Sequence, residues 1–136
     1  MKQLWRSKHS LWYSHLVMTI QEIANTLVQL CSVGKFQEAM ETLYSPGIVS
    51  VEATAPPGGS REATGLDAVR AKGKWWEDNH EVHGSKVEGP LVAGAHFAVT
   101  FKIDVTFKPQ SKRFVMEEVA VYKVADGKIV REEFFY

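Results

Sequence analysis

Two glutamates near the end of this 136-residue chain have the type and spacing needed for acid–base chemistry. Glu118 and Glu132 lie in two alternating segments, 113–124 and 128–136, which predict adjacent β-strands. We interpret the intervening "ADG" as a three-residue hairpin loop, which sets Ala120 opposite Glu132. Both glutamates then share one otherwise apolar face. Burial would raise the pKa of at least one carboxyl, which suits general acid–base catalysis, although structural pairing with a Lys, Arg, Tyr or His would also explain them.

A second charged pair lies in the regular stretch "FAVTFKIDVTFK", residues 97–108. Strict alternation predicts a β-strand on which Lys102 and Asp104 share a face. That face is either solvated, with a weak surface ion pair, or turned into a pocket. We predict that Asp104 shares a face with Glu118. In that arrangement the apolar row points outward and a second subunit covers it: Phe97, Val99, Phe101, Ile103, Val105 and Phe107.

His83 is a further candidate, on an expected strand at 81–87. It could shuttle protons, because histidine titrates near neutral pH, or serve a structural role. The histidines at 80, 83 and 96 do not have the spacing of a metal-binding motif, and "PPGGS" lacks the spacing and the lysine of a phosphate-binding loop. We therefore predict neither a metal nor a cofactor. The lone Cys31 is expected to be a small buried hydrophobe.

The elements that would position these groups follow from periodicity and capping. "TIQE" at 19–22 is a capping box that opens a first helix, and Gly34 ends it. Further helices are predicted around Phe36 to Leu43 and at 66–79. Strands at 48–53, 81–87, 97–108, 113–124 and 128–136 complete an α+β fold, with helices on one face of a curled, mostly antiparallel sheet.

Composition narrows the class of protein. The chain is 45% hydrophobic and 24% charged, which predicts one globular domain. Sixteen basic and sixteen acidic residues cancel, so we expect no nucleic-acid partner and no membrane partner. A single cysteine fits a reducing, cytoplasmic location. The basic, aromatic residues 1–17 are interpreted as a poorly ordered N-terminal extension before a domain at 18–136.

The order of the elements, with "GKFQEAMETLYSP", "GLDAVRAKGKWW" and "ADGKIVREEFFY" at the matching points, resembles the NTF2-like superfamily and, within it, the SnoaL-like proteins. The resemblance covers residues 19–136. It implies a cone of three helices closed by a curved sheet, with an apolar-walled pocket inside. It also implies a homodimer joined through the outer face of the sheet. Members include enzymes and binding modules, so the resemblance does not decide between the two.

Two enzyme types of this superfamily match only in part. Limonene-epoxide hydrolases place Arg-x-Asp where this chain has Lys102-x-Asp104, and their second Asp falls on Phe134, with Glu132 nearby. Ketosteroid isomerases use a Tyr near the start of the first helix, where this chain has Ile20 and Ile23. Neither activity carries over residue by residue.

These considerations predict a cofactor-independent enzyme of the isomerase, hydrolase, dehydratase or cyclase type that acts on a small apolar molecule. Glu118, Glu132 and Asp104 would supply the acid–base groups, and Lys102 and His83 would orient the substrate or stabilise charge. The alternative is a non-catalytic binding or dimeric association module of the same fold. The expected pocket wall consists of Tyr44, Trp75, Trp76, Tyr122, Phe134 and Tyr136.

Overall fold

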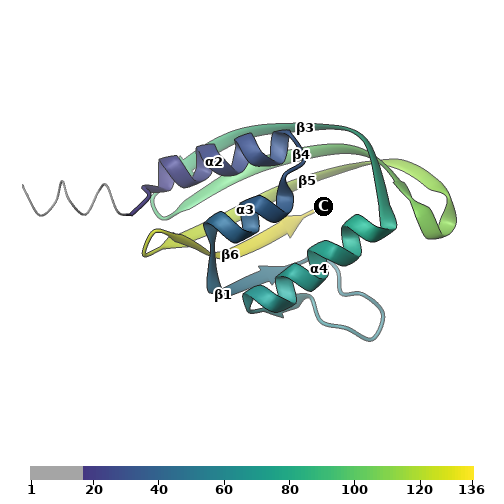
Figure 1. Cartoon of the computed structure of the whole chain (residues 1–136), viewed down its shortest axis with the longest axis horizontal. Helices are drawn as coiled ribbons and strands as arrows, with labels where there is room; N and C mark the ends of the chain where they lie inside the picture. Colours follow the sequence, from purple (N-terminus) through teal and green to yellow (C-terminus); the bar gives the residue numbers. More distant parts are fainter. Residues whose placement is uncertain (1–16) are drawn as a thin grey trace, which may run out of the picture.

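The computed structural model describes residues 17–136, which form three α-helices and one six-stranded sheet (Figure 1). The predicted extension at 1–17 lies, apart from Val17, outside the described residues. The helices are α2 (Ile20–Ser32), α3 (Phe36–Leu43) and α4 (Leu66–Asn79). The strands are β1 (Tyr44–Val51), β2 (Glu62–Thr64), β3 (His80–Ala93), β4 (His96–Phe107), β5 (Lys112–Ala125) and β6 (Lys128–Phe135), and a 3-10 turn (Lys108–Gln110) joins β4 to β5.

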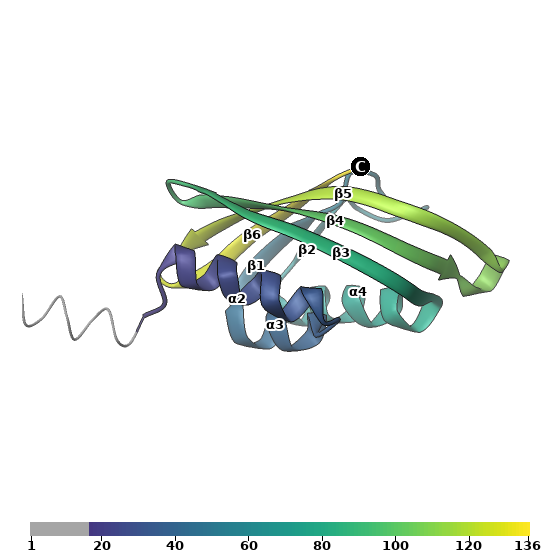
Figure 2. The same cartoon turned by 90° about the horizontal axis from the view of Figure 1, so that it is seen from above.

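The sheet has the order β2-β1-β6-β5-β4-β3 and is antiparallel except where β1 runs parallel to β6. It curves over the three helices, which all lie on its concave side (Figure 2). The predicted α+β fold, with helices on one face of a curved and mostly antiparallel sheet, is confirmed. The parallel β1–β6 pair brings the first strand next to the last, and most of the candidate site is built on these two strands.

The first helix begins at the capping box predicted from "TIQE". The Thr19 hydroxyl accepts a hydrogen bond from the Glu22 amide at 3.2 Å, and the Glu22 carboxylate reaches back to the Thr19 amide. One face of α2 is buried against the sheet, with Ile23, Ala24, Leu27 and Cys31. Within residues 17–136 no helix has both the length and the apolar character needed to cross a membrane.

Strand β4 turns its apolar row inward, which is the reverse of the predicted arrangement. Phe101 lies opposite Glu118, and Asp104 lies opposite Val115, so Asp104 and Glu118 are on different faces. The prediction that they share a face is therefore wrong. The physical reason is the core: burying this row against the helices removes far more apolar surface from water than burying Lys102 and Asp104 could. The buried members of the row are Phe97, Val99, Phe101, Ile103 and Val105.

The β5–β6 hairpin has a different turn from the predicted three-residue loop. Ala125 pairs with Lys128, and Asp126 and Gly127 both have positive φ (50° and 73°), as in a two-residue type I′ turn. A bulge at Val130 follows, because the pairing passes from Val124–Ile129 to Lys123–Arg131.

The turn and the bulge together set which side chains face the helices. The register differs by two residues from the predicted one, so that Tyr122 lies opposite Glu132 and Ala120 opposite Phe134. A shift of two residues keeps the side chains that follow the bulge on their predicted face, because the side-chain period of a strand is two. Glu118 and Glu132 are therefore both on the concave face, as predicted, while the two-residue turn pairs Ile129 with Val124 and so places Ile129 in the core instead of outward.

Candidate active site

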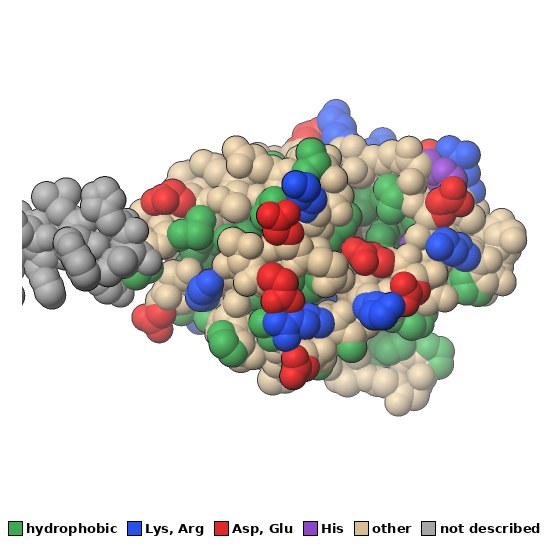
Figure 3. Space-filling model, in the orientation of Figure 1, with side chains coloured by type: hydrophobic (Ala, Val, Ile, Leu, Met, Phe, Trp, Pro, Cys, Tyr) green, Lys and Arg blue, Asp and Glu red, His purple; other side chains and the backbone are tan. Residues whose placement is uncertain are grey.

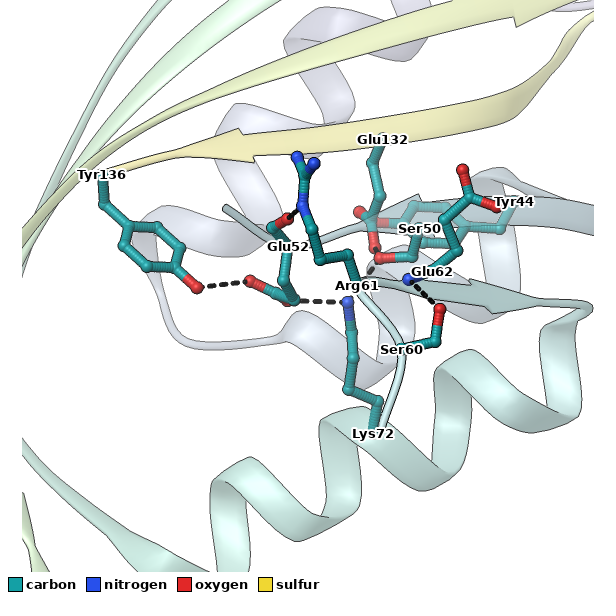
Figure 4. A network of polar contacts seen from close by, with 9 residues as sticks. All are labelled: Tyr44, Ser50, Glu52, Ser60, Arg61, Glu62, Lys72, Glu132 and Tyr136. Atoms are coloured by element: carbon teal, nitrogen blue, oxygen red, sulfur yellow. Dashed lines mark hydrogen bonds and ion pairs between the residues drawn. The ribbon is translucent and has the colours of Figure 1, made fainter. Parts of the chain in front are cut away.

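A buried carboxyl, that of Glu132 on β6, lies at the centre of a polar network on the concave face (Figure 4). The parallel pairing of β1 and β6 places Ser50 beside Glu132, and the Ser50 hydroxyl donates to Glu132 Oε1 at 2.7 Å. The Tyr44 hydroxyl donates to the other carboxylate oxygen. Burial raises the pKa of Glu132 above its usual range, and these two hydrogen bonds oppose the rise.

Lys72 on α4 extends the network toward Tyr136, which follows the end of β6. Its ammonium donates to Ser50 Oγ at 2.5 Å and to Glu52 Oε1 at 2.7 Å. The other oxygen of Glu52 accepts a hydrogen bond from the Tyr136 hydroxyl at 3.3 Å. A continuous set of hydrogen bonds thus runs from the buried Tyr44 to the exposed Tyr136 (Figure 4).

Glu118 on β5 is a second carboxyl on this face, and its surroundings differ from those of Glu132. Burial raises its pKa to about 7, the charges of Glu52 and Glu132 raise it too, and Lys72 opposes them. Among residues 17–136 no side chain donates a hydrogen bond to it or forms an ion pair with it. Glu118 is therefore a carboxyl that can gain or lose a proton near neutral pH, close to a fixed cation.

Cys31 on α2 and Tyr122 on β5 close the inner end of the site. Burial, with Glu132 nearby, raises the pKa of the Cys31 thiol to about 12, so the thiol stays protonated. This agrees with the expectation of a buried small hydrophobe. The Tyr122 ring stacks on Phe97 at a centroid distance of 4.7 Å, and burial raises the pKa of its hydroxyl as well.

The other three predicted catalytic residues lie on the outer face, away from Glu118 and Glu132. Lys102 forms an ion pair with Glu117 at 3.4 Å. Asp104 accepts two hydrogen bonds from Arg113, at 3.0 and 2.8 Å, which lower the pKa of its carboxyl. The exposed His83 has its Nε2 atom 2.6 Å from the Thr106 hydroxyl. The structure therefore brings together only two of the five predicted groups.

The predicted wall residues divide in a similar way. Tyr44, Tyr122, Phe134 and Tyr136 border the network, and Trp76 packs against the core and stacks on His80 at 4.4 Å. Trp75 is 56% exposed at the far end of α4 and is not part of this wall. Figure 3 shows a recess between the helices and β3, with hydrophobic side chains on its floor.

Sequence reasoning missed Ser50, Glu52 and Lys72. The sequence did contain a signal for the first two. In the segment 48–53, Ser50 and Glu52 lie two and four residues after the apolar Ile48, so their side chains point to the same buried face of the strand. Lys72 lies three residues after the buried Val69, on the same side of α4. In the described part of the chain no three His, Cys, Asp or Glu side chains converge as metal ligands.

Comparison with known proteins identifies the family. The model of the SnoaL-like domain matches residues 18–136, and the chain therefore belongs to the family of SnoaL-like domains. Among solved structures, a protein from Mesorhizobium loti is 44% identical, with a TM-score of 0.83, and the match covers 88% of this chain and 100% of that one. It is described as a proposed SnoaL-like polyketide cyclase and also labelled a carbohydrate phosphatase.

More distant structures share the fold. A proposed isomerase from Bacillus subtilis is 18% identical with a TM-score of 0.68, over 86% of this chain and 88% of that one. A protein from Catenulispora acidiphila with a ketosteroid isomerase-like fold, in complex with trimethylamine, is 18% identical with a TM-score of 0.66, over 87% of each chain. No protein of curated function matches the chain.

Proposed function

We propose that this protein is a cofactor-independent enzyme that moves protons on a small, largely apolar substrate bound against the concave face of the sheet. The observation that carries the proposal is Glu118, a half-buried carboxyl with a pKa of about 7 and no partner among the residues described. A general base or acid works best when its pKa lies near the working pH. Glu132, held by Tyr44 and Ser50, keeps the surroundings of Glu118 polar.

The reaction type that fits this site is removal of a proton from a carbon next to a carbonyl group. The Glu118 carboxylate takes the proton, the C–H electron pair forms the enolate, and the neutral Glu118 returns the proton to carbon or oxygen. Isomerisations and cyclisations both proceed through such a step. The family membership and the names of the Mesorhizobium and Bacillus proteins support this class. The two descriptions of the Mesorhizobium protein differ, so its name alone does not select the reaction.

Hydrogen exchange tests the proposal without knowledge of the natural substrate. The protein is incubated in deuterium oxide with a panel of cyclic ketones and β-diketones, and deuterium at the α-carbon is followed by NMR. We expect accelerated exchange for some members of the panel, and its loss in Glu118→Gln. The control is Glu117→Gln, since the neighbouring Glu117 points to the outer face and pairs with Lys102.

The result also decides between turnover and binding alone. If panel compounds bind but neither the wild type nor the Gln variant accelerates exchange, the site is a binding site without proton transfer. The hydrogen-bonded state of Glu132 and the Lys72–Glu52 ion pair favour this alternative, because groups held in such contacts are less free to react. Exchange that survives Glu118→Gln would contradict the role of Glu118.

We also propose that a second copy of the chain covers the outer face of the sheet. Val115, Val119 and Phe135 are exposed there by 53%, 40% and 49%. A groove of about 410 Å³ on this face carries charges of both signs, so it can pair with its own copy about a twofold axis. Its charged residues on the outer face are Lys86, Glu88, Lys102 and Glu117, and Glu118 on the same strand also contributes to its lining.

A further inference from the structure

We propose that Lys72 binds the carbonyl oxygen of the substrate and stabilises the negative charge that develops on it. The site would accordingly take small enolisable ketones, with the oxygen directed at α4 and the acidic carbon at Glu118. The inference rests on the proposed function and names the substrate class for the same site. Lys72 would thus have the charge-stabilising role that was predicted for Lys102, which lies on the outer face.

The Lys72 ammonium has one N–H donor that a ligand can use. A lysine ammonium has three N–H donors. Two of them are used by the described residues, one for Ser50 Oγ at 2.5 Å and one for Glu52 Oε1 at 2.7 Å. The third is not used by any residue between 17 and 136. It is therefore available to an acceptor on a bound molecule.

The ammonium is held in place before any ligand arrives. Ser50 is completely buried and is itself held by Glu132, and Glu52 is tied to Tyr136. Lys72 Nζ also lies 5.3 Å from the centroid of the Phe134 ring, in a favourable cation–π position. Only 30% of the Lys72 side chain is exposed. A cation fixed and partly shielded from water stabilises developing charge more strongly than a mobile, hydrated one.

The charges near Lys72 favour the enolate over the bound ketone. Before proton transfer, the negative charge resides on the Glu118 carboxylate, which is close enough for Lys72 to lower its pKa. After transfer, Glu118 is neutral and the negative charge is on the ligand oxygen. If that oxygen is hydrogen-bonded to Lys72, the attraction grows as the proton moves, which is the condition for lowering a barrier.

Arg61 is the other cation drawn near the opening of this site (Figure 4). It is exposed, and its Nε atom donates to the main-chain oxygen of Glu52 at 3.0 Å. A solvated guanidinium at the surface contributes less to a buried charge than the half-buried Lys72. Arg61 therefore serves as a comparison in the test.

Binding of an enolate analogue tests the inference without any turnover. The probe is 4-nitrophenol, whose ionised oxygen resembles an enolate and whose visible absorbance reports ionisation, and the matched neutral probe is 4-nitroanisole. We expect Lys72→Met to weaken binding of the phenolate roughly ten-fold or more, as for a lost charge-assisted hydrogen bond. Binding of 4-nitroanisole should change little. Lys74→Met, on the exposed side of α4 where Lys74 pairs with Asp78, and Arg61→Met should leave both unchanged.

A second variant keeps the test decisive if Lys72→Met does not fold. Glu52→Gln removes the carboxylate that competes for Lys72, so we expect the phenolate to bind more tightly. If Lys72 had only a structural role, the phenolate would bind more weakly to Glu52→Gln than to the wild type. Equal losses for both probes in Lys72→Met, unchanged phenolate binding, or the same loss in Arg61→Met would each overturn the inference. Failure of the proposed function is distinguishable, since it shows in the exchange experiment, as exchange that the wild type does not accelerate or that survives Glu118→Gln.

Discussion

The two glutamates on the concave face show how the same side chain acquires different properties from its neighbours. Glu132 is fully buried, which raises its pKa, and hydrogen bonds from Tyr44 and Ser50 oppose that rise by stabilising its charged form. Glu118 is less buried, yet lacks such donors among the described residues, and its pKa rises to about 7. A carboxyl held by donors is suited to structure, and one without them to proton transfer.

At this scale, Glu118→Gln should change the dependence of stability on pH. The pKa of Glu118 rises from 4.5 in the unfolded chain to about 7 in the folded protein, so the folded state binds the extra proton between these values. The free energy of unfolding therefore falls as the pH rises from 4.5 through 7, by at most about 3 kcal/mol. Urea unfolding should find Glu118→Gln more stable than the wild type at pH 8 and close to it at pH 4.

The exposed Glu117 provides the control for that measurement. Glu117→Gln should shift stability little at either pH, because a surface ion pair such as the one with Lys102 contributes little. Greater stability of the wild type at pH 8 would show that the charged form of Glu118 has a stabilising partner, and would contradict the assignment of its pKa.

Tyr44 is expected to stabilise the fold through its hydrogen bond to Glu132. Tyr44→Phe removes a donor from a buried carboxylate, which should cost about 1–3 kcal/mol at neutral pH and raise the pKa of Glu132 further. The control is Tyr122→Phe, since Tyr122 is equally buried opposite Glu132 but is not hydrogen-bonded to it. Thermal unfolding of both variants checks the difference, and equal losses would contradict it.

At the scale of elements, periodicity and capping predicted the helices and strands well. They did not predict how neighbouring strands are joined and which face of a strand meets the helices. The alternation in 97–108 identified β4, but alternation cannot tell which face meets the helices. The two glutamates were placed on the correct face although the turn was wrong, because the type I′ turn and the bulge at Val130 together shift the register by an even number.

Contacts between residues on elements that are distant in the sequence could not be predicted from the sequence patterns. Ser50, Lys72 and Glu132 come from a strand, a helix and another strand, and their contact depends on the parallel β1–β6 pair. Single-sequence patterns describe local periods and do not report such pairing. Lys72 could be placed on one side of α4, but not next to Ser50.

The hairpin turn that sets the register of β6 should be sensitive at Gly127. Gly127 has φ of 73°, and an added Cβ would overlap the Val17 side chain. Gly127→Ala should therefore cost clearly more than the roughly 1–2 kcal/mol expected for left-handed strain alone. The matched control is Gly94→Ala in the β3–β4 turn, where φ is 58° and the surrounding space is open. Chemical unfolding measures both, and equal losses would show that Val17 does not restrict the turn.

At the scale of the whole molecule, the curved sheet separates two kinds of surface. The concave face holds the buried polar network, and the outer face holds paired charges and exposed apolar side chains. These two surfaces can act independently, because a strand sends alternate residues to opposite faces. A change on the outer face should therefore alter assembly and leave ligand binding intact.

That independence makes the proposed dimer testable. We expect the wild type to be a dimer at micromolar concentration by light scattering, and Val119→Lys or Phe135→Lys to shift it toward a monomer, since either places a desolvated charge in the contact. Val33→Lys is the control, because Val33 is exposed at the end of α2, on the opposite side of the sheet. A monomeric wild type, or a dimer that only Val33→Lys disrupts, would rule out the outer face as the interface.

Binding of 4-nitrophenol should be the same in the monomeric variants as in the wild type, because Glu118 and Lys72 lie on the concave side.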